Sequence, residues 1–178
     1  LVYLGMILGG LPFVQLDRTG IALLGAIAMV ASGALAERAA LLAIDLPTIL
    51  LLFSLMVVSS QLALGGFYTR VAAALENSLR QPRRFLVMSM LAVAGLSAVL
   101  TNDVVCLALA PLLAATTRRA GLNPVPHLLG LAAAANIGSA ATIIGNPQNI
   151  LIGQFGRLHF GHFLAWCSVP TVLSLGAA

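Results

Sequence analysis

The run Leu100-Thr101-Asn102-Asp103-Val104-Val105 sets a polar triplet with one carboxylate in the middle of a long apolar stretch. Residues 136–149 interrupt a second apolar stretch with the sequence Asn-Ile-Gly-Ser-Ala-Ala-Thr-Ile-Ile-Gly-Asn-Pro-Gln-Asn. We name residues 101–103 the first break and residues 136–149 the second break. Neither has the length or charge of a surface loop. At membrane depth, polar helix-breaking backbone persists only where it is buried in protein or lines a cavity, and an ionisable side chain there is a functional candidate.

The composition predicts a membrane protein. Of the 178 residues, 60% are hydrophobic and 8% are charged, and the mean hydropathy is +1.04. Soluble domains carry about 25% charged residues, so a water-soluble fold could not hide this much apolar surface. The net charge of +4 comes from nine Arg residues and no Lys. Arg clustered in short loops is the usual topology signal of a membrane protein, and we expect no nucleic-acid partner.

The apolar segments predict an all-α polytopic membrane fold, with residues 1–178 forming part of a single transmembrane domain. The expected elements are transmembrane spans at 1–16, 20–36 and 47–67, an interfacial helix at 68–84, a re-entrant helical hairpin at 85–117, a discontinuous helix at 124–153 and a further span at 161–178. Because the chain begins and ends inside apolar runs, we interpret it as a portion of a longer protein.

The prediction of a re-entrant hairpin depends on helix length. As one continuous helix, residues 85–117 would be about 50 Å long, whereas a bilayer core is about 30 Å thick. A turn at the first break leaves two arms of about 15 residues, each reaching about 22 Å. If both arms enter from one face, the arginines divide seven to two between the faces, against six to three for a crossing segment. The positive-inside rule therefore favours a hairpin whose mouth faces the cytoplasm.

Broken helices expose backbone groups that can bind ions. A helix end presents free carbonyl groups with partial negative charge, and a helix start presents free N–H groups with partial positive charge. Carbonyl oxygens suit a hard cation such as Na⁺, and N–H groups suit a carboxylate or oxyanion. Side chains at the two breaks add neutral oxygen and amide groups: Thr101, Asn102, Ser139, Thr142, Asn146 and Asn149.

Structural roles compete with binding for several of these residues. Asp103 is either the N-cap of the second arm alone, or a cap that also serves an ion or proton. Asn146-Pro147 is a pairing typical of a helix start, and Gly138 and Gly145 can serve tight backbone turns alone. We favour a functional interpretation because two breaks in neighbouring spans are hard to explain by capping.

Both breaks resemble motifs of the ion transporter superfamily, which includes divalent-anion/sodium symporters, citrate transporter-like proteins and arsenite permeases. Residues 100–103, followed by an apolar arm ending in Ala110-Pro111-Leu112, resemble its hairpin motif. Residues 135–149 resemble its Gly-Thr-Gly-Pro-Asn motif in the unwound span. Residues 44–53 resemble the start of a span in the arsenite permease and sodium/proton antiporter branch, and the similarity covers about residues 17–170.

The resemblance implies two inverted repeats, each with a hairpin and an unwound helix, of which this chain would supply most of the first. The implied binding residues for a coupling cation and one side of the substrate are Thr101, Asn102, Asp103, Gly138, Thr142 and Asn149. The candidate site also includes Ser139, Gly145 and Asn146, with a Na⁺ site at Thr101, Asn102 and Gly138. The family's carboxylate symporters usually read Ser-Asn-Thr at the hairpin. Asp103 departs from that pattern, and an ionised Asp repels a dianion, which favours an anion permease of the arsenite type.

The sequence therefore predicts a secondary active transporter of a small anion or oxyanion, coupled to Na⁺ or H⁺, in the inner or plasma membrane. The expected partners are a small inorganic or organic anion, the lipid bilayer and a second repeat, with a homodimer left open. We expect no other cofactor and no enzymatic activity, because Asp103 has no acidic partner in another span. The alternative is a channel with half-helices meeting at mid-membrane, although Asn146-Pro147 is the only Asn-Pro pair at such a break.

Overall fold

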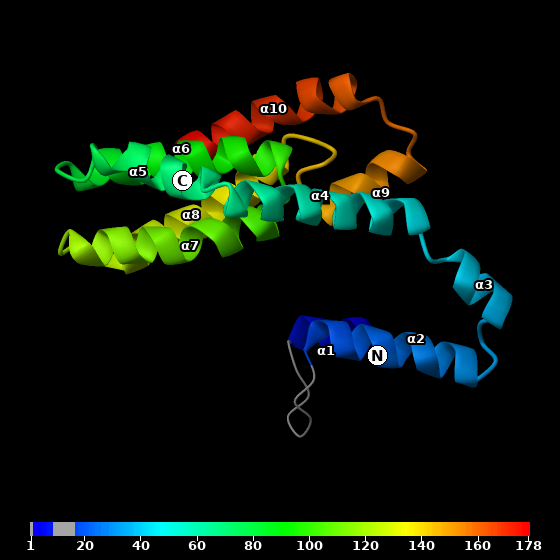
Figure 1. Cartoon of the computed structure of the whole chain (residues 1–178). Helices are drawn as coiled ribbons and strands as arrows, with labels where there is room; N and C mark the ends of the chain where they lie inside the picture. The colour runs from blue at the N-terminus through cyan, green and yellow to red at the C-terminus, as the bar shows by residue number, and fades with distance from the viewer. Residues whose placement is uncertain (1, 9–16) are drawn as a thin grey trace. The chain divides into compact units, whose positions relative to one another are not determined.

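The computed structural model describes residues 2–8 and 17–178, and every regular element within them is a helix (Figure 1). The elements are α1 (Val2–Leu8), α2 (Arg18–Ala31), α3 (Glu37–Leu42), α4 (Leu46–Leu64), α5 (Phe67–Glu76), α6 (Pro82–Val99), α7 (Asn102–Arg119), α8 (Pro124–Ser139), α9 (Pro147–Phe155) and α10 (Phe160–Ala177). Three described helices, α4, α6 and α10, are long and apolar enough to cross a bilayer. The predicted all-helical membrane fold class is confirmed.

The chain divides into two compact units, one ending at Leu46 and the other running from Pro47 to Ala178. In the first unit α1 packs against α2, and Gly25 makes room for this contact, since a Cβ there would lie 2.4 Å from Val2 Cγ2. The span predicted at 20–36 is helical only as far as Ala31. The span predicted at 1–16 is helical from residue 2 to residue 8, and its remainder lies outside the described residues.

The helix predicted at 68–84 is interrupted in the structure. Helix α5 ends at Glu76 and α6 begins at Pro82, with Gln81 extended at φ −123° and ψ 90°. Proline disfavours the α conformation in the residue before it, and it suits the first position of a helix because its missing N–H is not needed there. The segment from Pro82 to Arg84 therefore belongs to the first arm of the hairpin.

Helices α6 and α7 run antiparallel, with the chain turning between them at Leu100 and Thr101 (Figure 1). Each arm has 18 residues, which is longer than the predicted arms and corresponds to about 27 Å. The length of the arms alone therefore does not prevent them from crossing a bilayer. The depth of the turn depends instead on the neighbouring helices α8 and α9.

The core of the second unit forms where α8 packs against α6 and α7. Val93 of α6, Val105 and Leu109 of α7, and Ala134 and Ala135 of α8 are almost fully buried. Small residues on α8 let the helix backbones approach closely, as is common between helices in membranes.

Gly138 marks the closest approach of α8 to α6. A Cβ at this position would lie 2.3 Å from the carbonyl oxygen of Ala94 and 2.4 Å from its Cα. No side chain can occupy that space without moving the two helix backbones apart. Gly138 is therefore required by packing, whatever its role in ion binding.

We predict that Gly138→Ala lowers the free energy of unfolding by about 1–3 kcal/mol, the usual cost of overpacking a core. Gly95→Ala on α6 is the matched control, because nothing lies within 4 Å of a Cβ there. It should be neutral or should stabilise by up to about 1 kcal/mol through helix propensity. Chemical-denaturation midpoints of the purified full-length protein provide the measurement, and equal midpoints for both variants would contradict this packing.

Candidate functional site

The two breaks meet through reciprocal hydrogen bonds. The backbone N–H of Asn102, in the first turn of α7, donates to the carbonyl oxygen of Gly145 at 3.1 Å. In the other direction, the hydroxyl of Thr142 donates to the carbonyl oxygen of Ala98 in the last turn of α6 at 2.5 Å. Each break therefore satisfies backbone groups that the other break leaves without a helical partner.

The first break is shorter than the predicted one. Only Leu100 and Thr101 are non-helical, both in extended conformation, and Thr101 occupies the N-cap position of α7 without a side-chain capping bond. Asp103 lies inside the first turn of α7, so the prediction that it forms the N-cap is wrong. A carboxylate in the first turn still interacts favourably with the helix dipole. The N–H groups of Asp103 and Val104 have no hydrogen-bond partner among the described residues.

The second break is held together by its own side chains. Asn146 is the N-cap of α9, and its Oδ1 accepts the N–H of Asn149 at 2.8 Å. The Nδ2 of Asn149 donates to the carbonyl oxygens of Thr142 at 2.8 Å and Ser139 at 3.3 Å. The loop folds so tightly that a Cβ on Gly145 would lie 2.2 Å from the Ser139 carbonyl oxygen. Asn146, Asn149 and Gly145 therefore have structural roles in this loop. Their positions in the sequence alone did not distinguish such roles from ligand binding.

Asn136 connects the two breaks and was not among the predicted site residues. Its Oδ1 accepts from Asn102 Nδ2 at 3.3 Å, and its Nδ2 donates to the Ala132 carbonyl oxygen at 2.9 Å. The sequence contained a signal for this role, because Asn136 is the first residue of the second break. The Oδ1 of Asn102 is buried and has no hydrogen-bond partner among the described residues. Such an oxygen is a candidate ligand, because an unpaired buried polar atom is costly.

Asp103 and Thr101 line a cavity of 290 Å³ with Val104 and Leu107 of α7, Leu52 and Met56 of α4, and Pro147 of α9. Residues from the first turns of two helices, α7 and α9, thus line this cavity, and the N-terminal end of a helix carries a partial positive charge. The Asp103 side chain is exposed. The cavity therefore combines one carboxylate with two helix N-termini, beside the breaks but on the α4 side of α7.

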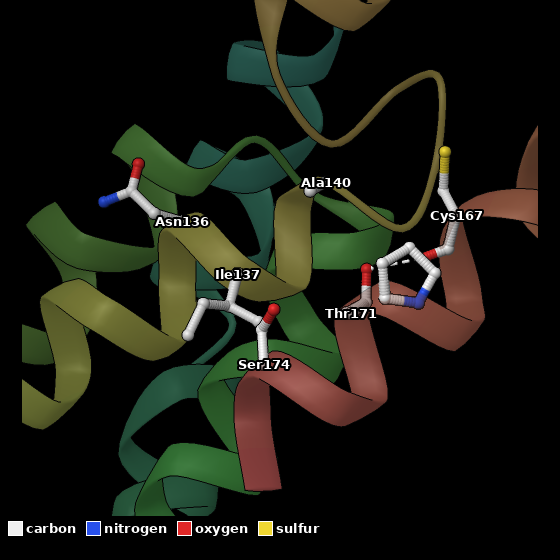
Figure 2. Close-up of a pocket in the computed structure, with 7 residues that line it drawn as sticks. Asn136, Ile137, Ala140, Cys167, Thr171 and Ser174 are labelled. Atoms are coloured by element: carbon white, nitrogen blue, oxygen red, sulfur yellow. Dashed lines mark hydrogen bonds between the residues drawn. The ribbon is translucent and has the colours of Figure 1, made fainter. Parts of the chain in front are cut away.

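A second hollow of 370 Å³ lies between α8 and α10 (Figure 2). It is lined by Asn136, Ile137, Ala140, Cys167, Pro170, Thr171 and Ser174. Figure 2 shows the amide of Asn136 turned away from α10, and the Thr171 hydroxyl donates to the Cys167 carbonyl oxygen at 2.7 Å. None of the nine predicted site residues lines this hollow.

The structure thus brings Asn102, Thr142 and Gly145 together, and it joins Ser139, Asn146 and Asn149 in the adjoining loop. It places Thr101 and Asp103 at the cavity beside α4. The carbonyl oxygen of Gly138, a predicted Na⁺ ligand, accepts the N–H of Ala141 at 3.1 Å. The Na⁺ site at Thr101, Asn102 and Gly138 remains a prediction.

Comparison with known proteins gives one consistent group of relatives. A family model described as citrate transporter matches residues 3–178. The silicon efflux transporter LSI3 of Oryza sativa subsp. japonica is 37% identical over 86% of this chain and 32% of its own length. The inner membrane protein YbiR of Escherichia coli K12 is 39% identical over 69% of this chain and 33% of its own length.

A protein of Dictyostelium discoideum assigned as a transporter, arsB, is 31% identical over 90% of this chain and 28% of its own length. The chain therefore spans about a third of the length of the curated relatives that it matches. No solved structure matches the chain at a significant level.

We predict that Thr142→Val lowers the free energy of unfolding by about 1–3 kcal/mol, because the half-buried carbonyl of Ala98 loses its donor. Thr142→Ser is the matched control, since it keeps the hydroxyl at the same position and should retain most of the stability. Denaturation midpoints in one detergent give the comparison. A Val variant as stable as the Ser variant would show that this bond does not hold the breaks together.

Proposed function

The chain belongs to the citrate transporter family, and from this we propose that it forms part of a secondary active transporter of a small anion or oxyanion, coupled to Na⁺ or H⁺. The observation that carries the proposal is the junction of two helix breaks, in which Asn102 bonds to Gly145 and Thr142 bonds to Ala98. Secondary transporters build their substrate and ion sites from discontinuous helices of this kind near the bilayer midplane.

We propose that α6 and α7 form a re-entrant hairpin. Helix α8 has 16 residues and α9 adds 9 more, which correspond to about 24 Å and 13 Å. The hairpin turn bonds to the loop between them, and Figure 1 shows α9 extending beyond the turn. If α8 and α9 together cross a bilayer core of about 30 Å, the turn lies inside the membrane, roughly the length of α9 from the far face.

The chemistry of the Asp103 cavity supports a particular class of solute. The N-termini of α7 and α9 favour an oxyanion, whereas the Asp103 carboxylate repels a dianion and accepts hydrogen bonds from hydroxyl groups. A weak oxyacid that carries hydroxyl groups and at most one negative charge satisfies both conditions. The rice relative is named a silicon efflux transporter, and silicon in water is a hydroxylated weak acid of this type.

The Asp103 carboxylate can also couple the binding of an ion to the binding of the solute. An anion can share the cavity with Asp103 when a proton or a Na⁺ ion neutralises the acid, so binding of the ion and binding of the solute favour each other. The buried and unpaired Oδ1 of Asn102 is a further oxygen for a coupling cation. In this proposal a second repeat of the full-length protein supplies the other side of the site, in the inner or plasma membrane.

We predict that a spin label at Val99→Cys lies about 13 Å deeper in the bilayer than one at Arg157→Cys, because the length of α9 separates the two levels. Val99 is exposed on α6 next to the turn, and Arg157 follows α9. Depth is measured from collision rates with oxygen and with a polar relaxation agent, in full-length protein whose other cysteines are replaced by Ser. Equal depths would mean that the hairpin crosses the membrane completely.

We predict that Asp103→Asn reduces gradient-driven uptake of oxyanions in proteoliposomes about tenfold, equivalent to about 1.4 kcal/mol of coupling, because the amide cannot take up a proton or pair with a cation. Glu76→Gln removes one acidic charge from an exposed position on α5 and is expected to leave uptake unchanged. Uptake is measured with imposed Na⁺ and H⁺ gradients and after their collapse.

Two outcomes would contradict this assignment. Full gradient-driven uptake by Asp103→Asn would remove the residue from coupling. Flux through the unmodified protein that ignores both gradients would indicate a channel in place of a carrier.

A further inference from the structure

A cavity of 250 Å³ lies at the mouth of the hairpin, far along α6 from the breaks. It sits between the first turns of α6 and α8 and is lined by Arg83, Asn123 and His127 together with Leu86, Leu122 and two prolines. It shares no residue with the Asp103 cavity. Its polar groups therefore have no part in the proposed transport site.

These polar groups are suited to an anion. Gln81 makes no side-chain capping bond to α6, and the N–H groups of Arg83 and Arg84 in the first turn have no hydrogen-bond partner in the described part of the chain. A helix start with free N–H groups attracts negative charge. The Arg83 guanidinium makes no ion pair or hydrogen bond within the described residues, and Asn123 Oδ1 accepts from Val125, which leaves its Nδ2 free to donate.

His127 gives an independent indication that this cavity binds a ligand. Its residue is only 5% exposed, and its Nδ1 is buried without a hydrogen bond among the described residues. The imidazole is held in place by Phe85, whose ring centroid lies 5.1 Å away. A buried and unpaired polar atom is costly, so a ligand that supplied a hydrogen bond here would be favoured.

An apolar groove adjoins this cavity. It has a volume of 490 Å³ and runs between α6 and α10, with Val87, Met90 and Leu91 on one side and Val172 and Leu175 on the other. Leu86 belongs to the walls of both hollows. A ligand with an anionic head and an apolar tail could therefore occupy the cavity and the groove together.

The positive charge at this end of the hairpin favours an anionic ligand. Five arginines lie at the start of α6, in the turn before it and at the end of α7: Arg80, Arg83, Arg84, Arg118 and Arg119. Figure 1 shows the start of α6 and the end of α7 at the same end of the hairpin. Basic residues near a membrane surface attract anionic lipid.

We infer that this end of the protein binds an anionic phospholipid, with the phosphate between Arg83 and His127 and an acyl chain in the groove between α6 and α10. The arrangement requires only that the chain lies in a bilayer, and it holds whether or not the proposed transport function is correct. A phospholipid of the surrounding leaflet is the occupant that supplies both the negative head and the apolar tail.

Native mass spectrometry of the full-length protein with added phosphatidylglycerol or phosphatidylcholine tests the site. The expected result is preferential retention of phosphatidylglycerol, weakened about fivefold by Arg83→Gln. Arg84→Gln is the matched control, because it removes the same charge from the neighbouring residue, which does not line the cavity. His127→Phe keeps an aromatic ring beside Phe85 and should also weaken binding, since it removes the unpaired nitrogen.

Several results would overturn the inference. Equal retention of the two lipids, or equal losses in Arg83→Gln and Arg84→Gln, would show that no specific headgroup site exists. Competition by glycerol phosphate as strong as that by phosphatidylglycerol would identify a site for free phosphate esters. Arg83 is exposed, and unchanged melting temperatures in zwitterionic detergent would show that the variants are folded.

Discussion

The rest of the second unit depends on the reciprocal hydrogen bonds between its two helix breaks. Asn102 donates to Gly145, and Thr142 donates to Ala98. An unpaired backbone group in an apolar environment costs several kcal/mol, so a lone break in a membrane helix would be strongly destabilising. Two breaks placed against each other remove much of this cost. The small residues that bring α8 close to α6, of which Gly138 is the tightest, make the junction possible.

This junction also divides the polar residues by role. Ser139, Asn146 and Asn149 hydrogen-bond within the loop that they build. Among the described residues, the Oδ1 of Asn102 and the N–H groups of Asp103 and Val104, on the hairpin side, have no hydrogen-bond partner. A transported solute or ion can interact with groups that the fold does not already use, so Asn102 and the Asp103 cavity are the strongest candidates among the predicted site residues.

Three helices of the second unit begin with proline, and their caps differ. Helices α8 and α9 start at Pro124 and Pro147, and each is capped by the asparagine before it. Helix α6 starts at Pro82 after Gln81, which makes no capping bond. Each of the first two helix starts thus has one N–H bonded to a capping side chain, whereas the third start, beside Arg83 and His127, has no such cap among the described residues. This difference distinguishes the mouth of the hairpin, where we place a lipid phosphate, from the turn at its other end.

The sequence alone determined the features that depend on local physics. Its apolar composition specified helices in a membrane, the polar residues located both breaks, and Asn146-Pro147 marked the start of α9. Features that depend on contacts between distant segments appeared only in the tertiary structure. Asp103 lies in the first turn of α7, after Asn102, whose N–H donates to Gly145, and Asn136 joins the site because α8 packs beside the hairpin turn. Spacing along the chain can locate a helix break, but only the packing of α6, α7 and α8 decides which of its polar groups are used by the fold and which remain free to bind.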